Sequence, residues 1–272
     1  MTSELSKKIG VLIPTTSHGR PEWRNVTHTY LFNYTLKSFL QTMSLEHHYI
    51  FYIGIDDNDR IFSHLANRQM IYSLKANYPN TSYKFISMAP AKKGHLTKMW
   101  NILFKYAYEQ GCDYFFQCGD DINFKSKYWI NDAIRILEKN NNIGITAPIC
   151  VAKNYQIPKI LTQSFVSRKH MEIFGWYFPE EIINWFCDNW INAVYKPNHW
   201  FPLHEHYCSN DGGTERYTVG EIDSSKKIGI DINFIKEVKA SNSVNDTLHK
   251  LSEHAYKLAS NHKNLVENFL KK

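Results

Sequence analysis

The chain has 272 residues, 43% of them hydrophobic and 21% charged, which excludes a disordered polypeptide and allows the core of one large globular domain. Its formal net charge of +6 favours a ligand that carries phosphate, but the sequence has no long block of Lys and Arg of the kind that follows a nucleic-acid backbone. A phosphorylated small molecule is therefore the expected partner, and nucleic acid is not.

The cysteines and the N-terminus both favour a reducing compartment. The five cysteines are odd in number and show no Cys-x-x-Cys spacing, so neither a disulfide framework nor a zinc site is predicted. Residues 1–8 hold no apolar segment of a secretory signal, and no stretch approaches the roughly 20 apolar residues of a transmembrane helix. We expect a cytoplasmic protein without a transmembrane segment, either free or peripheral at a membrane.

Apolar strands and amphipathic helices alternate through residue 150. Short apolar segments bounded by turn residues predict strands over residues 9–14, 49–55, 83–88, 114–118 and 143–149. Apolar side chains spaced by about 3.6 residues predict helices over residues 27–43, 60–78, 95–110 and 127–139. This alternation predicts an α/β fold with a mostly parallel central sheet and helices on both faces.

Polar residues follow three of these strands at the point where each strand ends. A polar loop with a basic residue, 15–20, follows the first strand, Asp56-Asp57-Asn58-Asp59 follows the second, and Gly119-Asp120-Asp121 follows the fourth. Because the carboxyl ends of parallel strands meet at one edge of a sheet, we expect the ligand site there. Magnesium or manganese with a phosphorylated ligand would explain the paired acids, although an isolated Asp-Asp pair more commonly opens a turn.

The alternation stops after residue 150. An extended segment over 163–170 is followed by a turn over 174–179, an amphipathic helix from 180 to about 195 and a histidine-rich stretch over 199–207. From Asp211 the chain becomes polar, with Gly212-Gly213 as a hinge, and a further helix is predicted from 244 to 270. We expect residues 211–272 to be a mainly helical extension that serves as an appendage or an oligomer contact.

Taken in order, these motifs resemble those of nucleotide-sugar glycosyltransferases of the GT-A fold, in particular the inverting enzymes of family two. Leu12-Ile-Pro-Thr-Thr16 is similar to the strand and loop that lie against the nucleotide, and Ile55-Asp-Asp57 to the acidic motif of the second strand. Gly119-Asp120-Asp121 is similar to the Asp-x-Asp metal motif with its first acid replaced by Gly. The resemblance covers about residues 9 to 210 and implies a Rossmann-like GT-A fold with a C-terminal helical extension.

The resemblance implies a donor site for a nucleoside-diphosphate sugar, UDP-linked, in a half of about 1–125, and an acceptor half of about 126–210. It places Asp57 on the base and assigns Asp121 to manganese or magnesium, with His206 or His204 as a further ligand. The remaining donor contacts that it implies are Thr15, Thr16, Arg20, Lys98, Asn101 and Asp120.

Phe174 to Glu181, followed by Cys187-Asp188, is similar to the family's Gly-rich turn and acidic catalytic motif. Cys187 replaces the usual Glu of that motif, but the Asp is present. The resemblance therefore implies that Asp188 is the general base that activates an acceptor hydroxyl, with inversion at the anomeric carbon. The acceptor, a glycan, lipid or protein, is expected to bind to Trp176, Tyr177, Glu180 and Trp190.

Two other functions remain open from the sequence. Gly-Asp-Asp between apolar residues also occurs in polymerase palm domains, so Gly119-Asp120-Asp121 would also suit a nucleotidyltransferase with two metal ions. The Cys at position 187 keeps a second alternative open, a module that binds a sugar nucleotide or glycan without turnover.

Overall fold

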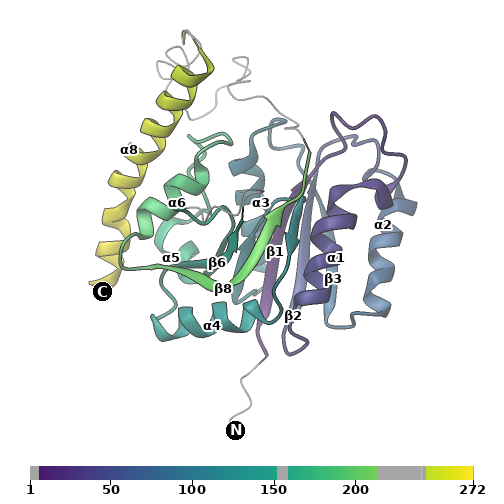
Figure 1. Ribbon diagram of the computed structural model, residues 1–272, viewed down its shortest axis with the longest axis horizontal. Helices are drawn as coiled ribbons and strands as arrows, with labels where there is room; N and C mark the ends of the chain where they lie inside the picture. The colour runs from purple at the N-terminus through teal and green to yellow at the C-terminus, as the bar shows by residue number, and fades with distance from the viewer. Residues whose placement is uncertain (1–5, 152–158, 214–239, 241–242, 272) are drawn as a thin grey trace.

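The computed structural model describes residues 6–151, 159–213, 240 and 243–271. Figure 1 shows a central sheet with helices on both sides and a long C-terminal helix, α8, that stands along one side of the molecule. The sheet has eight strands in the order β3-β2-β1-β4-β7-β6-β8-β5. The predicted α/β class is confirmed by this arrangement.

One half of the sheet is parallel and the other half is mixed. β2 pairs with β1 and β3, and β4 pairs with β1, all in parallel. β7 is antiparallel to both β4 and β6, β8 is parallel to β6, and β5 is antiparallel to β8. The strands are β1 (Lys8–Thr15), β2 (His48–Ile55), β3 (Thr81–Ser87), β4 (Tyr114–Gln117), β5 (Ile122–Phe124), β6 (Ile145–Cys150), β7 (Ser164–Ser167) and β8 (Trp200–Asn210).

Two of the helices differ from the prediction. A π-helical turn leads into α1, so the predicted helix over 27–43 is divided, and α6 begins seven residues later than the predicted start at 180. The α-helices are α1 (Lys37–Thr42), α2 (Leu65–Tyr72), α3 (Leu96–Glu109), α4 (Trp129–Lys139), α5 (Lys169–Phe174), α6 (Cys187–Tyr195) and α8 (Val244–Leu270). Shorter helical turns cover Val26–His28, Leu31–Leu36 and Ser73–Ala76.

The core lies where the sheet meets its helices. Every residue of β1 after Lys8 is buried, which is typical of a central strand covered on both faces. α3 packs closely on the parallel half, because a Cβ added at Gly10 of β1 would lie 3.0 Å from Ala107 of α3. A cluster of aromatic rings fills the space between α1, α4 and the sheet, and its members include Phe39, Phe116, Phe124, Trp129 and Phe165.

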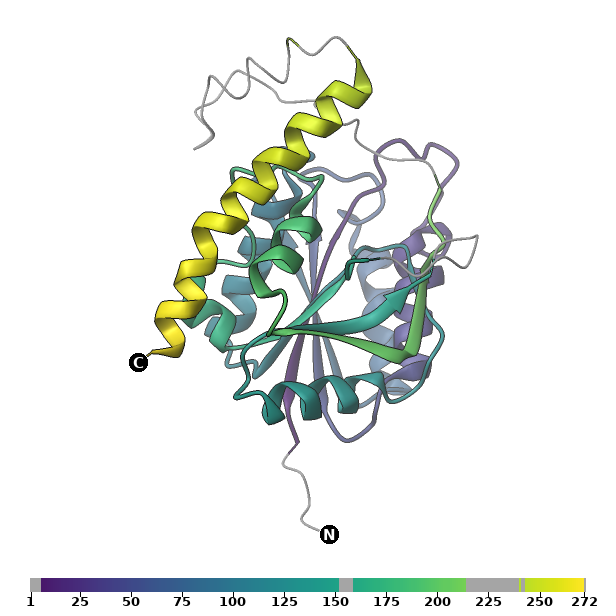
Figure 2. The ribbon, with the colours of Figure 1, turned by 60° about the vertical axis from the view of Figure 1, so that its left-hand side comes forward.

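The C-terminal helix α8 packs against α5 and α6. Figures 1 and 2 show α8 running along α6 in both views. Ala255, Ala259 and Val266 are buried on α8, whereas most of its other side chains are partly or fully exposed. In the described part of the chain, no helix is both long and apolar enough to cross a membrane.

One buried histidine links these packed elements to the pH dependence of stability. His170 of α5 lies with Nδ1 2.8 Å from Tyr195 Oη and Nε2 3.0 Å from Tyr177 O. Burial lowers the pKa of His170 to about 4. Because the folded state binds this proton more weakly than the unfolded chain, the stabilisation is present above pH ~6.5 and is lost as the pH falls toward 4.

We therefore predict that acidification over this range costs up to about 3 kcal/mol of unfolding free energy through His170 alone. Urea denaturation of the wild type and of His170→Gln at pH 7 and pH 4.5 measures it. The variant should be less stable at pH 7 and should lose less stability on acidification. An equal loss in both proteins would contradict the assignment.

Candidate functional site

The strands β1, β2 and β4 end at the same edge of the sheet, and a buried hydrogen bond joins two of them there. Thr15, the last residue of β1, donates its hydroxyl proton to Asp120 Oδ2 over 2.6 Å. Asp120 follows β4 and is fully buried. This bond fixes the loop after β1 against the turn that carries the two adjacent carboxylates.

The acids after β2 divide into a structural and an accessible group. Asp59 is buried and accepts hydrogen bonds from Ser17 N at 2.6 Å and from Ile61 N and Phe62 N at 2.9 Å each. It also accepts from the hydroxyls of Ser17 and Thr16. Asp57 is exposed, and its carboxylate lies 3.4 Å from Asn58 Nδ2. Asp57 is therefore the acid of this loop that a ligand can reach.

The two loops enclose a cavity of about 310 Å³, a volume at the lower end of the range for small-molecule sites. Arg60 holds one wall, since its guanidinium donates to Trp23 O at 2.6 Å and Arg20 O at 2.8 Å. Arg20 is buried with its guanidinium 5.5 Å from the centre of the Tyr30 ring. The cavity is lined by Thr16, Ser17, His18, Gly19, Arg20, Pro21, Asp56, Asp57, Asn58, Asp59, Arg60 and Lys93.

Asp121, the residue after Asp120, lies in a space that two glycines leave open. Its backbone O accepts from Asp211 N at 3.0 Å, which joins the turn after β4 to the end of β8. A Cβ added at Gly119 would lie 2.7 Å from Asp121 Oδ1, and one added at Gly212 would overlap Asp121 Oδ2. Side chains at either position would displace the carboxylate, so the two glycines form a cradle for it.

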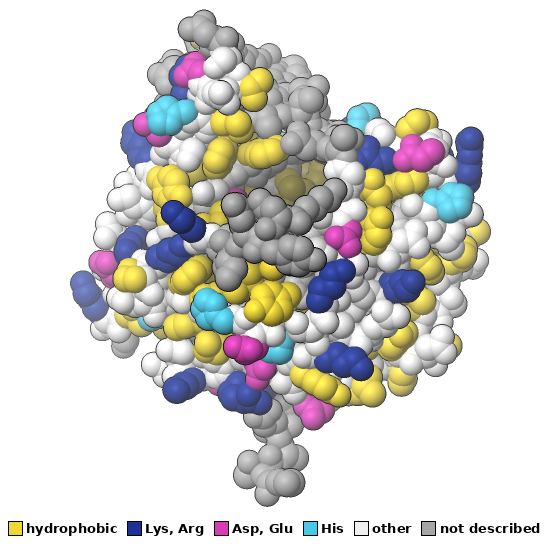
Figure 3. All heavy atoms as spheres, viewed as in Figure 1, with side chains coloured by type: hydrophobic (Ala, Val, Ile, Leu, Met, Phe, Trp, Pro, Cys, Tyr) yellow, Lys and Arg dark blue, Asp and Glu magenta, His cyan; other side chains and the backbone are white. Residues whose placement is uncertain are grey.

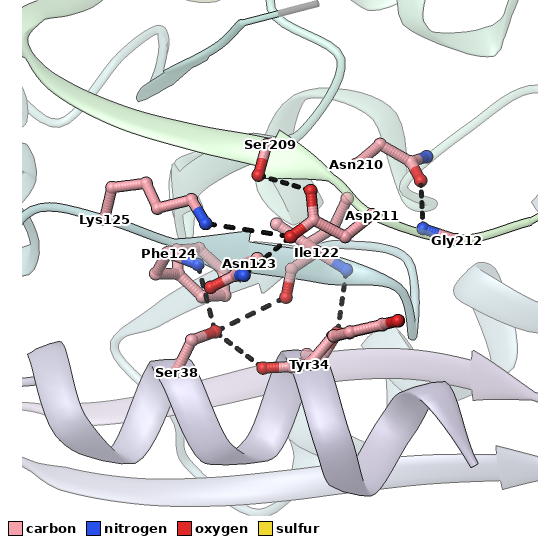
Figure 4. Close-up of polar contacts among 11 residues, drawn as sticks. Tyr34, Ser38, Ile122, Asn123, Phe124, Lys125, Ser209, Asn210, Asp211 and Gly212 are labelled. Atoms are coloured by element: carbon pink, nitrogen blue, oxygen red, sulfur yellow. Dashed lines mark hydrogen bonds and ion pairs between the residues drawn. The ribbon is translucent and has the colours of Figure 1, made fainter. Parts of the chain in front are cut away.

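Hydrogen bonds from α1 and the helical turn before it hold the edge strand β5, which follows the Gly119-Asp120-Asp121 turn. Ser38 Oγ accepts from Phe124 N at 3.0 Å (Figure 4). Thr35 Oγ1 accepts from Ile122 N at the same distance. Thr35 also donates to Gly119 O at 3.2 Å. The position of the Gly119-Asp120-Asp121 turn is therefore fixed on both sides.

Asp211, which sequence reasoning passed over, is used within the protein. Its carboxylate accepts from Ser209 Oγ at 2.7 Å and Asn123 Nδ2 at 2.6 Å, and it lies 3.7 Å from Lys125 Nζ (Figure 4). Burial alone would raise the pKa of Asp211. The hydrogen bonds and the nearby lysine together lower it by more, so the pKa lies below its usual value. Asp211 anchors the strand end beside Asp121 and is not free for a ligand.

The structure does not bring the expected histidine ligands to Asp121. β8 has an irregularity where Leu203 pairs with Pro148 and Tyr207 with the next residue, Ile149, so His204 and His206 lie in the segment between these two pairs. From there the strand runs on to Asn210, which is about 13 Å from His206 at roughly 3.3 Å per residue. His206 Nε2 lies 2.7 Å from Asp132 Oδ2 of α4, and His204 is exposed. Among the described residues, no group of three or more His, Cys, Asp or Glu side chains could hold a metal ion.

Two residues expected at the donor, Asn101 and Lys98, contact the turn that the sequence associated with the acceptor. Asn101 of α3 accepts from Tyr177 N and Phe178 N at 3.0 and 2.9 Å, and its Nδ2 donates to Phe178 O. Lys98, almost one helical turn earlier, lies with its Nζ 3.6 Å from Glu180 Oε2. Asn101 thus fixes the turn that the sequence associated with the acceptor.

Of the four expected acceptor residues, two are accessible. Trp176 and Glu180 are partly exposed, whereas Tyr177 and Trp190 are fully buried. Tyr177 Oη donates to Ser164 O at 2.8 Å, and the Trp190 ring packs against Trp176 with centres 5.3 Å apart. Tyr177 and Trp190 therefore support the surface that Trp176 and Glu180 present.

Asp188 lies in the first turn of α6 and is partly exposed. Its Oδ1 accepts from Asn189 N at 2.9 Å, and no described Lys, Arg or His forms an ion pair with it. Burial raises the pKa of the Asp188 carboxyl, and the backbone hydrogen bonds lower it by less. A carboxylate with a raised pKa is a stronger base, which suits it to take a proton from a hydroxyl group.

Comparison with known proteins identifies the fold. No protein-family model matches the sequence, and no curated protein is detectably similar to it. Solved structures do match. TarS 1–349 of S. aureus in complex with UDP-GlcNAc matches with a TM-score of 0.54 and 13% identity over 94% of this chain and 72% of that chain.

Two further structures agree. TarS 1–349 without a named ligand matches with a TM-score of 0.51 and 14% identity over 74% of this chain, which spans about 60% of that chain's length. GalNAc-T7 with UDP, GalNAc and Mn²⁺ matches with a TM-score of 0.55 and 10% identity over 80% of this chain and 46% of that chain. At these identities the likeness establishes the fold, and it confirms the predicted fold class.

The different roles of Asp59 and Asp57 in the loop after β2 can be tested by substitution. Asp59→Asn removes one of two acceptor oxygens and turns an amide toward Ser17, so we predict a loss of about 2–3 kcal/mol in unfolding free energy. Asp57→Asn, at an exposed position of the same loop, should change it by less than about 0.5 kcal/mol. Urea denaturation of both variants measures the difference, and equal effects would refute the division between them.

Proposed function

We propose that this chain, which has the GT-A fold, is a glycosyltransferase that moves a sugar from a UDP-linked donor to an acceptor hydroxyl. Fold alone does not define function, so the proposal depends on the site. The observation that carries it is the Thr15–Asp120 hydrogen bond, which fixes the loop of the cavity beside the turn bearing Asp121. A nucleotide pocket and the carboxylate that binds the diphosphate would have to be held next to each other in this way. UDP and UDP-GlcNAc in the similar structures support a UDP-linked donor.

The cavity supplies groups for each part of a nucleotide. Asp57 is exposed at its wall and would accept the imide N–H of uracil. Thr16 and Arg20 line the same cavity, and the Arg20 guanidinium would offset phosphate charge. Arg60 and Lys93 also line the cavity and add positive charge. The net positive charge of the chain favours the approach of such an anion.

A divalent ion suits Asp121. Magnesium is commonly held by one or two carboxylates together with phosphate oxygens, and the glycine cradle keeps the Asp121 carboxylate in place for that arrangement. When bound, such an ion would neutralise charge on the leaving diphosphate. His206 and His204 are left out of this set because of their distance along β8, and an all-oxygen set accepts magnesium as well as manganese.

Asp188 would act on the acceptor. As the acceptor oxygen attacks the anomeric carbon, its proton would pass to the Asp188 carboxylate while the bond to the diphosphate breaks on the opposite face, with inversion. The raised pKa of Asp188 supports this role. Trp176 would offer an aromatic face to the acceptor, and Glu180, paired with Lys98, would offer hydrogen-bond acceptors.

The alternatives are less well supported. Gly119-Asp120-Asp121 follows β4, which lies between the parallel strand β1 and the antiparallel strand β7. The strands β1 to β4 alternate with helices, whereas a palm-type nucleotidyltransferase would be built on an antiparallel sheet. A module that binds a sugar nucleotide without turnover remains an outcome of the assay below, since Cys187 occupies the position where the related motif has Glu.

The base is tested by transfer. The protein is incubated with magnesium or manganese, with UDP-glucose, UDP-galactose, UDP-GlcNAc or UDP-GalNAc, and with methyl glycosides as acceptors. We predict UDP release that depends on acceptor, and a fall in kcat of about 10²–10⁴-fold in Asp188→Asn with unchanged UDP affinity. Donor binding without product in the wild type would favour the binding module, and turnover unaffected by Asp188→Asn would remove the base assignment.

The metal ligands are tested by titration of magnesium and manganese in the same assay, with UDP binding measured by calorimetry. We predict that Asp121→Asn weakens the metal-dependent part of UDP binding by about tenfold or more, because it removes the charged oxygen ligand. His206→Asn, the matched control on β8, should leave that part unchanged. A loss of metal dependence in His206→Asn would instead restore histidine to the metal site.

A further inference from the structure

The first turn of α6 carries the proposed base but lacks a cap of its own. Phe186, the residue before α6, has a φ of 72°, and its side chain makes no capping hydrogen bond. Helix N-termini without a capping side chain are weakly held unless other contacts fix them. Because Asp188 Oδ1 accepts from its own neighbour Asn189 N, the direction of this carboxylate follows the start of the helix.

Two side chains of α8 hold the two residues that follow Asp188. Tyr256 Oη accepts a hydrogen bond from Asn189 Nδ2 at 3.0 Å, and His262 Nδ1 accepts one from Trp190 Nε1 at 3.2 Å. α8 lies along α6 in both ribbon views (Figure 1 and Figure 2). The start of α6 is therefore fixed by contacts from the far end of the sequence.

The contact from His262 is the more constrained of the two. Trp190 is fully buried, and an indole N–H can only donate, so the loss of His262 Nδ1 would leave a buried donor without this partner. The His262 ring also lies 5.3 Å from the Trp176 ring and 5.9 Å from the Trp190 ring, centre to centre. His262 thus touches both the helix of the proposed base and the aromatic residue on the acceptor side.

The local environment keeps His262 able to accept this hydrogen bond. Burial lowers the pKa of His262, and the nearby Glu181 carboxylate raises it by less. At neutral pH the ring is therefore uncharged, with Nδ1 as the acceptor for Trp190. In the space-filling view of Figure 3, hydrophobic side chains are interspersed with Lys and Arg side chains on the face of the molecule that carries α8.

We propose that His262 and Tyr256 of α8 are positioning residues for the acceptor step, which fix the first turn of α6 and so direct the Asp188 carboxylate toward the acceptor hydroxyl. This inference rests on the proposed function. It gives the C-terminal helix a part in the reaction, where the sequence predicted an appendage or an oligomer contact. Donor binding takes place at the edge of β1, β2 and β4 and does not depend on these contacts.

The test separates the two steps in the full-length protein, with UDP as the probe for donor binding and the most active UDP-sugar and methyl glycoside for transfer. His262→Leu removes the acceptor nitrogen, and we expect kcat to fall about tenfold or more, as for other small misplacements of a catalytic group, while UDP affinity is unchanged. His262→Asn keeps an amide oxygen close to the place of Nδ1 and should recover most of kcat.

Two further variants keep the inference open to refutation if His262→Leu does not fold. Tyr256→Phe removes one hydroxyl from a side chain that is 47% exposed and should lower kcat to a smaller extent, again with unchanged UDP affinity. Asn261→Ala, at the exposed position beside His262, is the matched control and should behave as the wild type.

Transfer at the wild-type rate by both Tyr256→Phe and His262→Leu would overturn the inference, as would the wild-type rate in Tyr256→Phe alone if His262→Leu does not fold. So would an equal fall in UDP affinity and kcat, with no recovery in His262→Asn, because that pattern indicates a general loss of structure. If the wild type itself neither binds UDP nor releases it from a donor, the proposed function has failed, and the inference fails with it.

Discussion

The buried carboxylate of Asp120 is the constraint on which the candidate site depends. It lies between the ends of β1 and β4, fully buried, and accepts from the Thr15 hydroxyl. A buried charge is stable only where polar groups satisfy it, so this pair fixes how the two strand ends meet. Asp121, the next residue of the same turn, lies against the glycine cradle formed by Gly119 and Gly212. Asp120 therefore belongs to the fold, whereas its neighbour Asp121 is partly exposed and is the proposed metal ligand.

Hydrogen bonds between segments far apart in sequence assemble the rest of the site around that point. Asp59 ties the loop after β2 to Ser17, and Asn101 of α3 holds the turn at residues 177 and 178. α8 in turn holds the start of α6. The proposed donor side lies at the parallel half of the sheet, and the proposed acceptor side lies on α6 and the turn at residues 177 and 178, which are held by tertiary contacts.

The sequence predicted the parallel half well because its strands are continuous apolar segments and its helices have clear periodicity, as in β1 and α3. It identified Asp57, Asp121 and Asp188 as distinct from their neighbours. In the structure Asp57 is exposed and Asp121 and Asp188 are partly exposed, whereas Asp59 is buried in a network of hydrogen bonds. Whether each carries its predicted role stays a prediction.

The rest depended on long-range pairing that local patterns do not encode. Residues 200–210 are polar enough to suggest a ligand loop, yet they pair with β6 and β5 as a strand, which carries His206 to Asp132. Asn101 was assigned to the donor because its motif is local, while its partners lie 76 and 77 residues away. The contacts of Tyr256 and His262 have no sequence signal, because they join one amphipathic helix to the start of another.

The anomeric configuration of the transferred sugar is the most direct test of the central claim. Proton NMR of the reaction of the wild-type protein with a UDP-sugar and an acceptor reads both the formation of a new glycosidic bond and its configuration. The account predicts a glycoside with the configuration opposite to that of the donor, since attack assisted by Asp188 takes place on the face away from the diphosphate. A glycoside with retained configuration, or no glycoside at all, would contradict it.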